Sequence, residues 1–125
     1  MDFDDFVGRV IDELDLGSRP QGIRAVRAVL TPLSQRIQEG EASDLAASLP
    51  MEIDFYVRNA KSGQRFSYEY FIDSVSEIEG VDRSDAYYHA KIVMKILGEA
   101  IPQGEMDDLK SNLPEEFDEL FELLD

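Results

Sequence analysis

The 125-residue sequence contains no cysteine, only four lysines and a single histidine. Without cysteine the chain can form no disulfide, no zinc–thiolate site and no cysteine nucleophile. It also lacks an apolar run long enough to cross a bilayer. Its first ten residues, MDFDDFVGRV, are acidic, whereas a signal peptide begins with basic residues. We therefore expect a cytoplasmic protein that makes no contact with a membrane.

Most motifs that carry catalytic chemistry are missing as well. The sequence has no Gly-rich phosphate loop, no G-x-S-x-G nucleophile turn and no dinucleotide fingerprint. His89 has no nucleophile motif beside it, so no triad role can be assigned to it. Acidic pairs such as Asp107 with Asp108 could bind a hard cation, but no calcium-loop pattern surrounds them. We expect no catalytic residue, no metal site and no cofactor, and a protein that is not an enzyme.

Negative charge dominates the composition. Fourteen Asp and thirteen Glu face eight Arg and four Lys, which gives a net charge of −15. The hydrophobic content of 43% is too high and too periodic for a disordered chain. A carboxylate-rich, lysine-poor surface suits concentrated salt, because salt screens the self-repulsion of the fold. We hypothesise a haloarchaeal origin, which predicts a higher melting temperature in molar KCl than in dilute buffer. Equal melting temperatures in the two would contradict it.

The sequence contains an internal repeat. Residues 40–50, GEASDLAASLP, and residues 104–114, GEMDDLKSNLP, are identical at six of eleven positions. The same offset of 64 residues aligns two apolar stripes with the spacing of a helix face. The first stripe consists of Ile23, Val26, Leu30, Leu33 and Ile37, and the second of Tyr87, Ala90, Met94, Leu97 and Ile101. We predict one domain, 1–125, with homologous halves at about 1–60 and 65–125.

Helical periodicity divides each half into four helices. First helices are predicted over 2–14 and 67–79, and long second helices over 19–38 and 83–102. Two short helices then close each half. No window alternates with the period of two that is typical of strands. The predicted fold is all-α, a compact bundle of about eight helices built from two homologous four-helix halves. The predicted N-caps are Asp2, Ser67 and Asp82.

Both copies of the repeated segment are expected to end one helix and begin the next. Gly40 and Gly104 are predicted at the ends of the long helices, where glycine accepts a left-handed conformation. Glu41 and Glu105 then fall in the first turn of the following helix, where the helix dipole favours acids. We interpret the repeated segment as architecture rather than as a duplicated site.

Three stretches of the sequence together resemble a known family. They are DFDDFVGRV near the start, RAVLTPLSQRIQEGEASDLAASLP, and GEMDDLKSNLPEEFDELF. The family they resemble is the prokaryotic domain-of-unknown-function family 2267, and the resemblance covers nearly the whole chain. It implies a compact helical protein of internally repeated build. The family carries no established catalytic residues, so the resemblance implies no site residue and leaves the function open.

Acidic residues are absent from two stretches of the predicted long helices, 16–38 and 86–98. The basic residues there are the candidates for binding an anionic partner. They are Arg24, Arg27, Arg36, Lys91 and Lys95. Burial of the long helices could exclude acids by desolvation while arginine heads pair with neighbouring acidic helices. Alternatively, the helices could present a basic face to nucleic acid, a phosphorylated ligand or an acidic protein.

These features predict a non-catalytic helical interaction or regulatory protein, with a protein partner or self-association as its mode of action. A nucleic-acid-associated factor using the basic helices 19–38 and 83–102 is the alternative. The surrounding negative charge and the lack of aromatic residues between the arginines count against that alternative. It requires an exposed cluster of the basic side chains on both helices, and internal ion pairs at those side chains would contradict it.

Overall fold

The computed structural model describes residues 1–124, apart from the side chain of Met51. This part of the chain contains seven α-helices, one 3₁₀ helix and no strand. They are α1 (Phe3–Leu14), α2 (Arg19–Arg36), α3 (Glu39–Ala47), α4 (Met51–Arg58), α5 (Tyr68–Glu79), α6 (Arg83–Ala100), α7 (Gln103–Ser111) and the 3₁₀ helix η1 (Glu115–Phe121). The predicted all-α bundle of about eight helices is confirmed.

The predicted N-caps hold the starts of three helices. Asp2 caps α1 and accepts a hydrogen bond from the backbone N–H of Asp5 at 2.8 Å. Ser67 caps α5, and Asp82 caps α6 through the backbone N–H of Asp85 at 2.8 Å. Each capping side chain accepts a hydrogen bond from a backbone N–H that has no partner within the helix. The sequence therefore specifies these starts locally.

Both long helices end two residues before the predicted ends at 38 and 102. The last helical residues are Arg36 and Ala100, and the next residues, Ile37 and Ile101, are extended with φ of −86° and −118°. Both isoleucine side chains are buried in the core. The chain therefore changes direction at an apolar anchor, because an extended residue at the helix end can direct its side chain inward.

Gly40 and Gly104 do not end the long helices. Each lies in the first turn of the following helix, α3 or α7, and neither has a positive φ. The prediction of a left-handed glycine at these positions is wrong, because the buried isoleucines have already ended α2 and α6. Glu41 and Glu105 do lie in the first turns of α3 and α7, as predicted.

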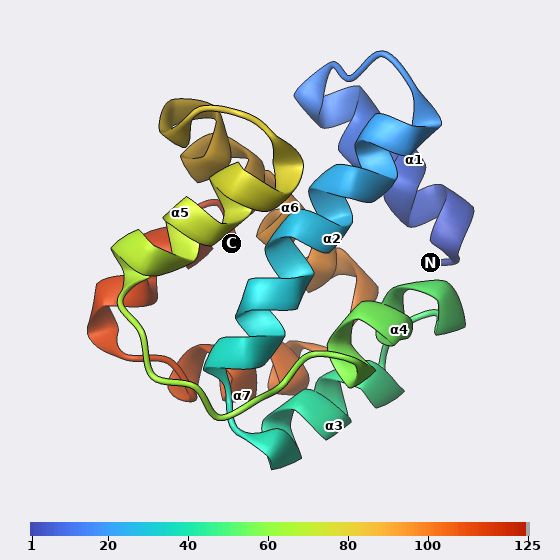
Figure 1. The fold of residues 1–125 in the computed structure, drawn as a ribbon. Helices are drawn as coiled ribbons and strands as arrows, with labels where there is room; N and C mark the ends of the chain where they lie inside the picture. Colours follow the sequence, from blue (N-terminus) through green and yellow to red (C-terminus); the bar gives the residue numbers. More distant parts are fainter. Residues whose placement is uncertain (125) are drawn as a thin grey trace.

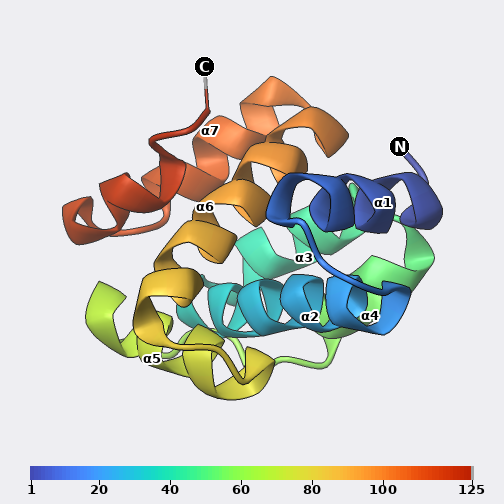
Figure 2. The ribbon, with the colours of Figure 1, turned by 90° about the horizontal axis from the view of Figure 1, so that it is seen from above.

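The two long helices run through the middle of the molecule (Figures 1 and 2). Helix α2 packs against α1, α4, α5 and α6, and α6 also packs against α1, α5 and η1. The first helix of each predicted half thus contacts the long helix of the other, and α3 contacts α7. This interlocking buries one continuous apolar core. Its largest fully buried side chains include Phe6, Phe71, Phe117, Leu30 and Leu33.

Three of the four pairs of corresponding helices in the two predicted halves have equal lengths, whereas α4 is an α-helix of eight residues and η1 is a 3₁₀ helix of seven. Helices α1 and α5 have 12 residues each, α2 and α6 have 18, and α3 and α7 have nine. These lengths agree with the predicted duplication, which stays a prediction. Among residues 1–124, no helix combines the length and the apolar content needed to cross a membrane.

Candidate functional site

The two candidate lysines of α6 are held in ion pairs within the protein. Lys91 Nζ lies 2.7 Å from Glu122 Oε1 and 3.1 Å from Glu119 Oε1. Lys95 Nζ lies 2.7 Å from Glu13 Oε1. The hydrogen bond to Glu122 raises the pKa of Lys91, and the hydrogen bond from Lys95 lowers the pKa of Glu13. Both lysine heads are engaged with acids of neighbouring helices, which argues against a basic surface shared by the two long helices.

The candidate arginines in the middle of α2 are placed differently. Arg24 and Arg27 are exposed, and neither forms an ion pair with any residue that the structure describes. Their spacing of three residues places them on the same side of the helix. In the predicted duplication Arg27 corresponds to Lys91. The two predicted equivalents therefore differ in charge pairing: Lys91 of α6 is neutralised by acids within residues 1–124, and Arg27 of α2 is not.

The cations without an ion pair are concentrated in one part of the fold. Within residues 1–124, six of the twelve Lys and Arg side chains form none. They are Arg24, Arg27, Arg36, Lys61, Arg65 and Lys110. Five of the six lie on α2 or on the linker 59–67, which is hydrogen-bonded to the C-terminal end of α2. The chain has 27 acids that could pair with these cations, yet these five cations of α2 and the linker form no ion pair within residues 1–124. The positive charge of this part of the fold is therefore available to a partner.

Arg36, the last residue of α2, is held in place without a carboxylate. Its Nε donates a hydrogen bond to the backbone oxygen of Phe66 at 2.8 Å. Its guanidinium carbon lies 5.4 Å from the centroid of the Phe117 ring and 5.9 Å from that of Phe66. These are cation–π contacts, which orient the planar group against the aromatic rings. Among the five candidates, Arg36 is the one whose side chain is fixed but not neutralised.

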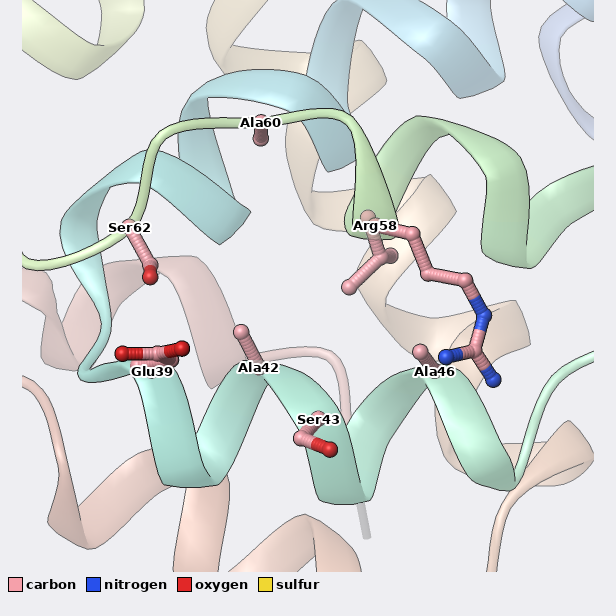
Figure 3. Close-up of a pocket in the computed structure, with 8 residues that line it drawn as sticks. Glu39, Ala42, Ser43, Ala46, Arg58, Ala60 and Ser62 are labelled. Atoms are coloured by element: carbon pink, nitrogen blue, oxygen red, sulfur yellow. The ribbon is translucent and has the colours of Figure 1, made fainter.

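A pocket of about 270 Å³ lies between α3, α4 and the linker (Figure 3). Small apolar side chains such as Ala42 and Ala46 form its α3 side. Glu39 and Arg58 lie toward opposite ends of the pocket, and Ser43 and Ser62 are the hydroxyl groups beside it. Arg58 is paired with Asp54 of its own helix at 3.4 Å. His89 is not part of the lining, so neither serine has a histidine base, and the pocket offers shape and polarity without an evident proton-transfer pair.

Two acids of the repeated segment face each other where α3 contacts α7. Burial raises the pKa of Glu41 to about 7, and the charge of Glu105 and a hydrogen bond to it add to this effect. The charges of Asp108 and Asp44 act in the same direction. One oxygen of each glutamate, Oε1, is buried and has no hydrogen-bond partner within residues 1–124. The sequence places both acids in first turns, but only the tertiary contact between the two helices brings them together.

The single histidine is buried beside an acid that the sequence analysis did not single out. His89 Nδ1 on α6 lies 2.6 Å from Glu79 Oε2 at the end of α5. The two residues are 8% and 6% exposed. The other carboxyl oxygen of Glu79 has no hydrogen-bond partner in the described part of the chain. The sequence does show that Glu79 is an acid on the last turn of a predicted helix. It does not show that Glu79 is buried, because this burial depends on the packing of α5 against α6.

Comparison with known proteins identifies a family and no activity. Residues 3–120 match the family described as "Uncharacterized conserved protein (DUF2267)". The match extends across both predicted halves and confirms the resemblance found in the sequence. No curated protein matches the chain. Any function must therefore be inferred from the residues described above.

Proposed function

Because the chain belongs to the DUF2267 family, whose description names no activity, we propose a function from its own surface. The protein is a non-catalytic interaction protein that binds an acidic segment of a protein partner through Arg24 and Arg27 of α2. One observation carries the proposal: these two arginines are exposed, one helical turn apart, and without an ion pair among residues 1–124 of a chain with a net charge of −15.

The charge of the whole protein favours a partner with few negative charges. Duplex DNA carries one negative charge per about 1.7 Å of its axis, so the surrounding acidic surface would repel it strongly. A short acidic peptide segment presents only the carboxylates that the two arginines contact. Arginine suits such a contact because its planar fork pairs with a carboxylate through two hydrogen bonds. It is also enriched in protein–protein interfaces, whereas lysine is depleted.

The placement of the reactive side chains supports a role without catalysis. The imidazole of His89 is packed against Glu79 in the interior. The hydroxyl groups beside the pocket of Figure 3 have no imidazole near them. General acid–base and nucleophilic mechanisms require such groups to converge on a substrate. Partner binding through a helix surface requires no such convergence.

Replacing both arginines, Arg24→Gln with Arg27→Gln, is expected to weaken partner binding at least about tenfold. Each arginine contributes charge-assisted hydrogen bonds that glutamine cannot replace. The partner is captured from a native high-salt extract on the immobilised protein and scored separately as protein and as nucleic acid. The dissociation constant of the purified partner is then measured for the wild type and the double variant by titration calorimetry.

The double variant Lys61→Gln with Lys110→Gln is the matched control. It makes the same change in net charge at two exposed lysines outside α2, one on the linker and one on α7. It should retain the partner with an affinity within about twofold of the wild type. Equal weakening by both double variants would show a non-specific charge effect and overturn the proposal. Capture of nucleic acid that is lost on mutation of Arg24 and Arg27 would favour the nucleic-acid alternative.

A further inference from the structure

A small polar pocket lies at the C-terminal end of α2, apart from the exposed face that carries Arg24 and Arg27. Its volume is about 240 Å³. It is lined by Arg36 and Gln38, by Gly63, Gln64 and Arg65 of the linker, and by Asn112 and Pro114 after α7. Pockets for drug-sized ligands have volumes of roughly 300–1,000 Å³, so this one suits a smaller group.

The linker is fixed at this pocket by backbone hydrogen bonds. Gly63 has a φ of +82°, a left-handed conformation that glycine adopts without strain. Its backbone N–H donates to the oxygen of Ile37 at 2.7 Å, and that of Gln64 donates to the oxygen of Gln35 at 2.8 Å. These bonds hold the next residue, Arg65, beside the end of α2, where it is exposed and lines the pocket.

Arg36 presents a second, oriented cation to the same pocket. Its Nε is occupied by the Phe66 oxygen, and its guanidinium group rests against the Phe66 and Phe117 rings. The terminal nitrogens Nη1 and Nη2 form no hydrogen bond or ion pair with residues 1–124. Because Arg36 is held through Nε and the face of its guanidinium group, the N–H groups on Nη1 and Nη2 remain available to a ligand. Since the side chain is already ordered, it loses little conformational entropy on binding.

The other side chains of the lining are compatible with an anion. None of the seven lining residues is acidic, although the chain has 27 acids. The side-chain oxygen of Asn112 accepts a hydrogen bond from the backbone N–H of Gln38 at 3.1 Å. This bond orients the amide and leaves its NH₂ group as the free end. The pocket therefore combines two cations with an amide donor.

We propose that this pocket binds the phosphate group of a small molecule, either inorganic phosphate or a phosphate monoester. A phosphate group carries a charge of about −1.5 to −2 at pH 7, which two arginines neutralise, whereas a single carboxylate would leave one of them uncompensated. The fork of Arg36 matches two oxygens of a tetrahedral oxyanion. This site is separate from the proposed interaction surface, since neither Arg24 nor Arg27 lines it.

The test is a titration of the ¹⁵N-labelled protein followed by NMR, with inorganic phosphate and, in a second arm, with O-phosphoserine. Ionic strength is kept constant with KCl, so that screening of the acidic surface does not change. We expect saturable shifts at the backbone N–H groups of residues 63–65 and at the Arg36 Nε–H. Similar affinities in the two arms indicate that the phosphate group alone is recognised, and tighter binding of phosphoserine indicates a monoester ligand.

Arg65→Gln is expected to weaken phosphate binding at least about tenfold, because it removes one of the two cations. Arg65 is exposed, so the variant should fold normally. Lys61→Gln is the matched control, with the same charge change on the same linker but outside the lining. Its affinity should stay within about twofold of the wild type. Arg36→Gln should abolish phosphate binding. If this substitution disturbs the packing against Phe117, the result for Arg65→Gln decides the test.

Two results would overturn this proposal. One is a shift that grows linearly with phosphate concentration and is reproduced by chloride, which indicates general ion binding. The other is an unchanged affinity in Arg65→Gln. The double substitution of Arg24 and Arg27 should leave phosphate binding intact, so failure of the proposed partner interaction and failure of this site are distinguishable.

Discussion

Replacing His89 with alanine is expected to lower the free energy of unfolding by about 3–5 kcal/mol at neutral pH. The imidazole is the hydrogen-bonding partner of the Glu79 carboxyl, and both residues are more than nine-tenths buried. One oxygen of that carboxyl already has no partner within residues 1–124. Without the imidazole the whole carboxyl would be buried and unpaired, which costs far more than an exposed ion pair contributes. Urea unfolding followed by circular dichroism measures the change.

Two further variants distinguish the loss of the His89–Glu79 pair from the effect of removing any side chain in this region. Tyr88→Ala removes the neighbouring side chain of the same helix, which is 51% exposed, and should change stability by no more than about 0.5 kcal/mol. Combining His89→Leu with Glu79→Leu replaces the pair by apolar groups, and such replacements are often neutral. The double variant should therefore be more stable than His89→Ala. A loss below about 1 kcal/mol for His89→Ala would show that water or rearrangement satisfies Glu79.

The parts of the fold that local chemistry determines were predictable from the sequence. The starts of α1, α5 and α6 follow from side chains that cap the backbone a few residues away. The ends of α2 and α6 were not predictable in this way. They depend on Ile37 and Ile101, whose burial is decided by the packing of the whole bundle. A glycine nearby in sequence gave the stronger local signal for a helix end, and it was misleading.

The candidate binding residues were likewise predictable only as far as local sequence determines them. The sequence identified the two acid-free stretches, but whether a cation on them is available depends on acids far away along the chain. Lys95 is paired with Glu13, which is 82 residues distant. Neither Arg24 nor Arg27 forms an ion pair with an acid of the described chain. The pocket at the end of α2 could not be found from the sequence, because it joins Arg36 to Arg65 and Asn112 through the path of the linker.

Replacing Glu41 with glutamine is expected to stabilise the protein above neutral pH. Burial and the charge of Glu105 raise the pKa of Glu41 from 4.5 to about 7. The folded protein therefore holds a proton on Glu41 that the unfolded chain releases at lower pH. Its contribution to stability is complete below about pH 4.5 and is lost as the pH rises through about 7. The full displacement corresponds to roughly 3 kcal/mol, and solvent screening at this partly exposed carboxyl reduces the expected gain to about 1–2 kcal/mol.

Glutamine keeps a hydrogen-bond donor toward Glu105 but carries no charge, so the variant does not lose this contribution when the pH rises. Unfolding free energies from urea titrations between pH 4.5 and 8.5 should show a gap between Glu41→Gln and the wild type that opens as the pH rises. Glu39→Gln is the matched control, since it removes the same charge from an exposed position in the same helical turn. Its gap should remain within about 0.5 kcal/mol throughout. A gap for Glu41→Gln that does not change with pH would mean that neither burial nor the charge of Glu105 raises the pKa of Glu41 in the folded protein.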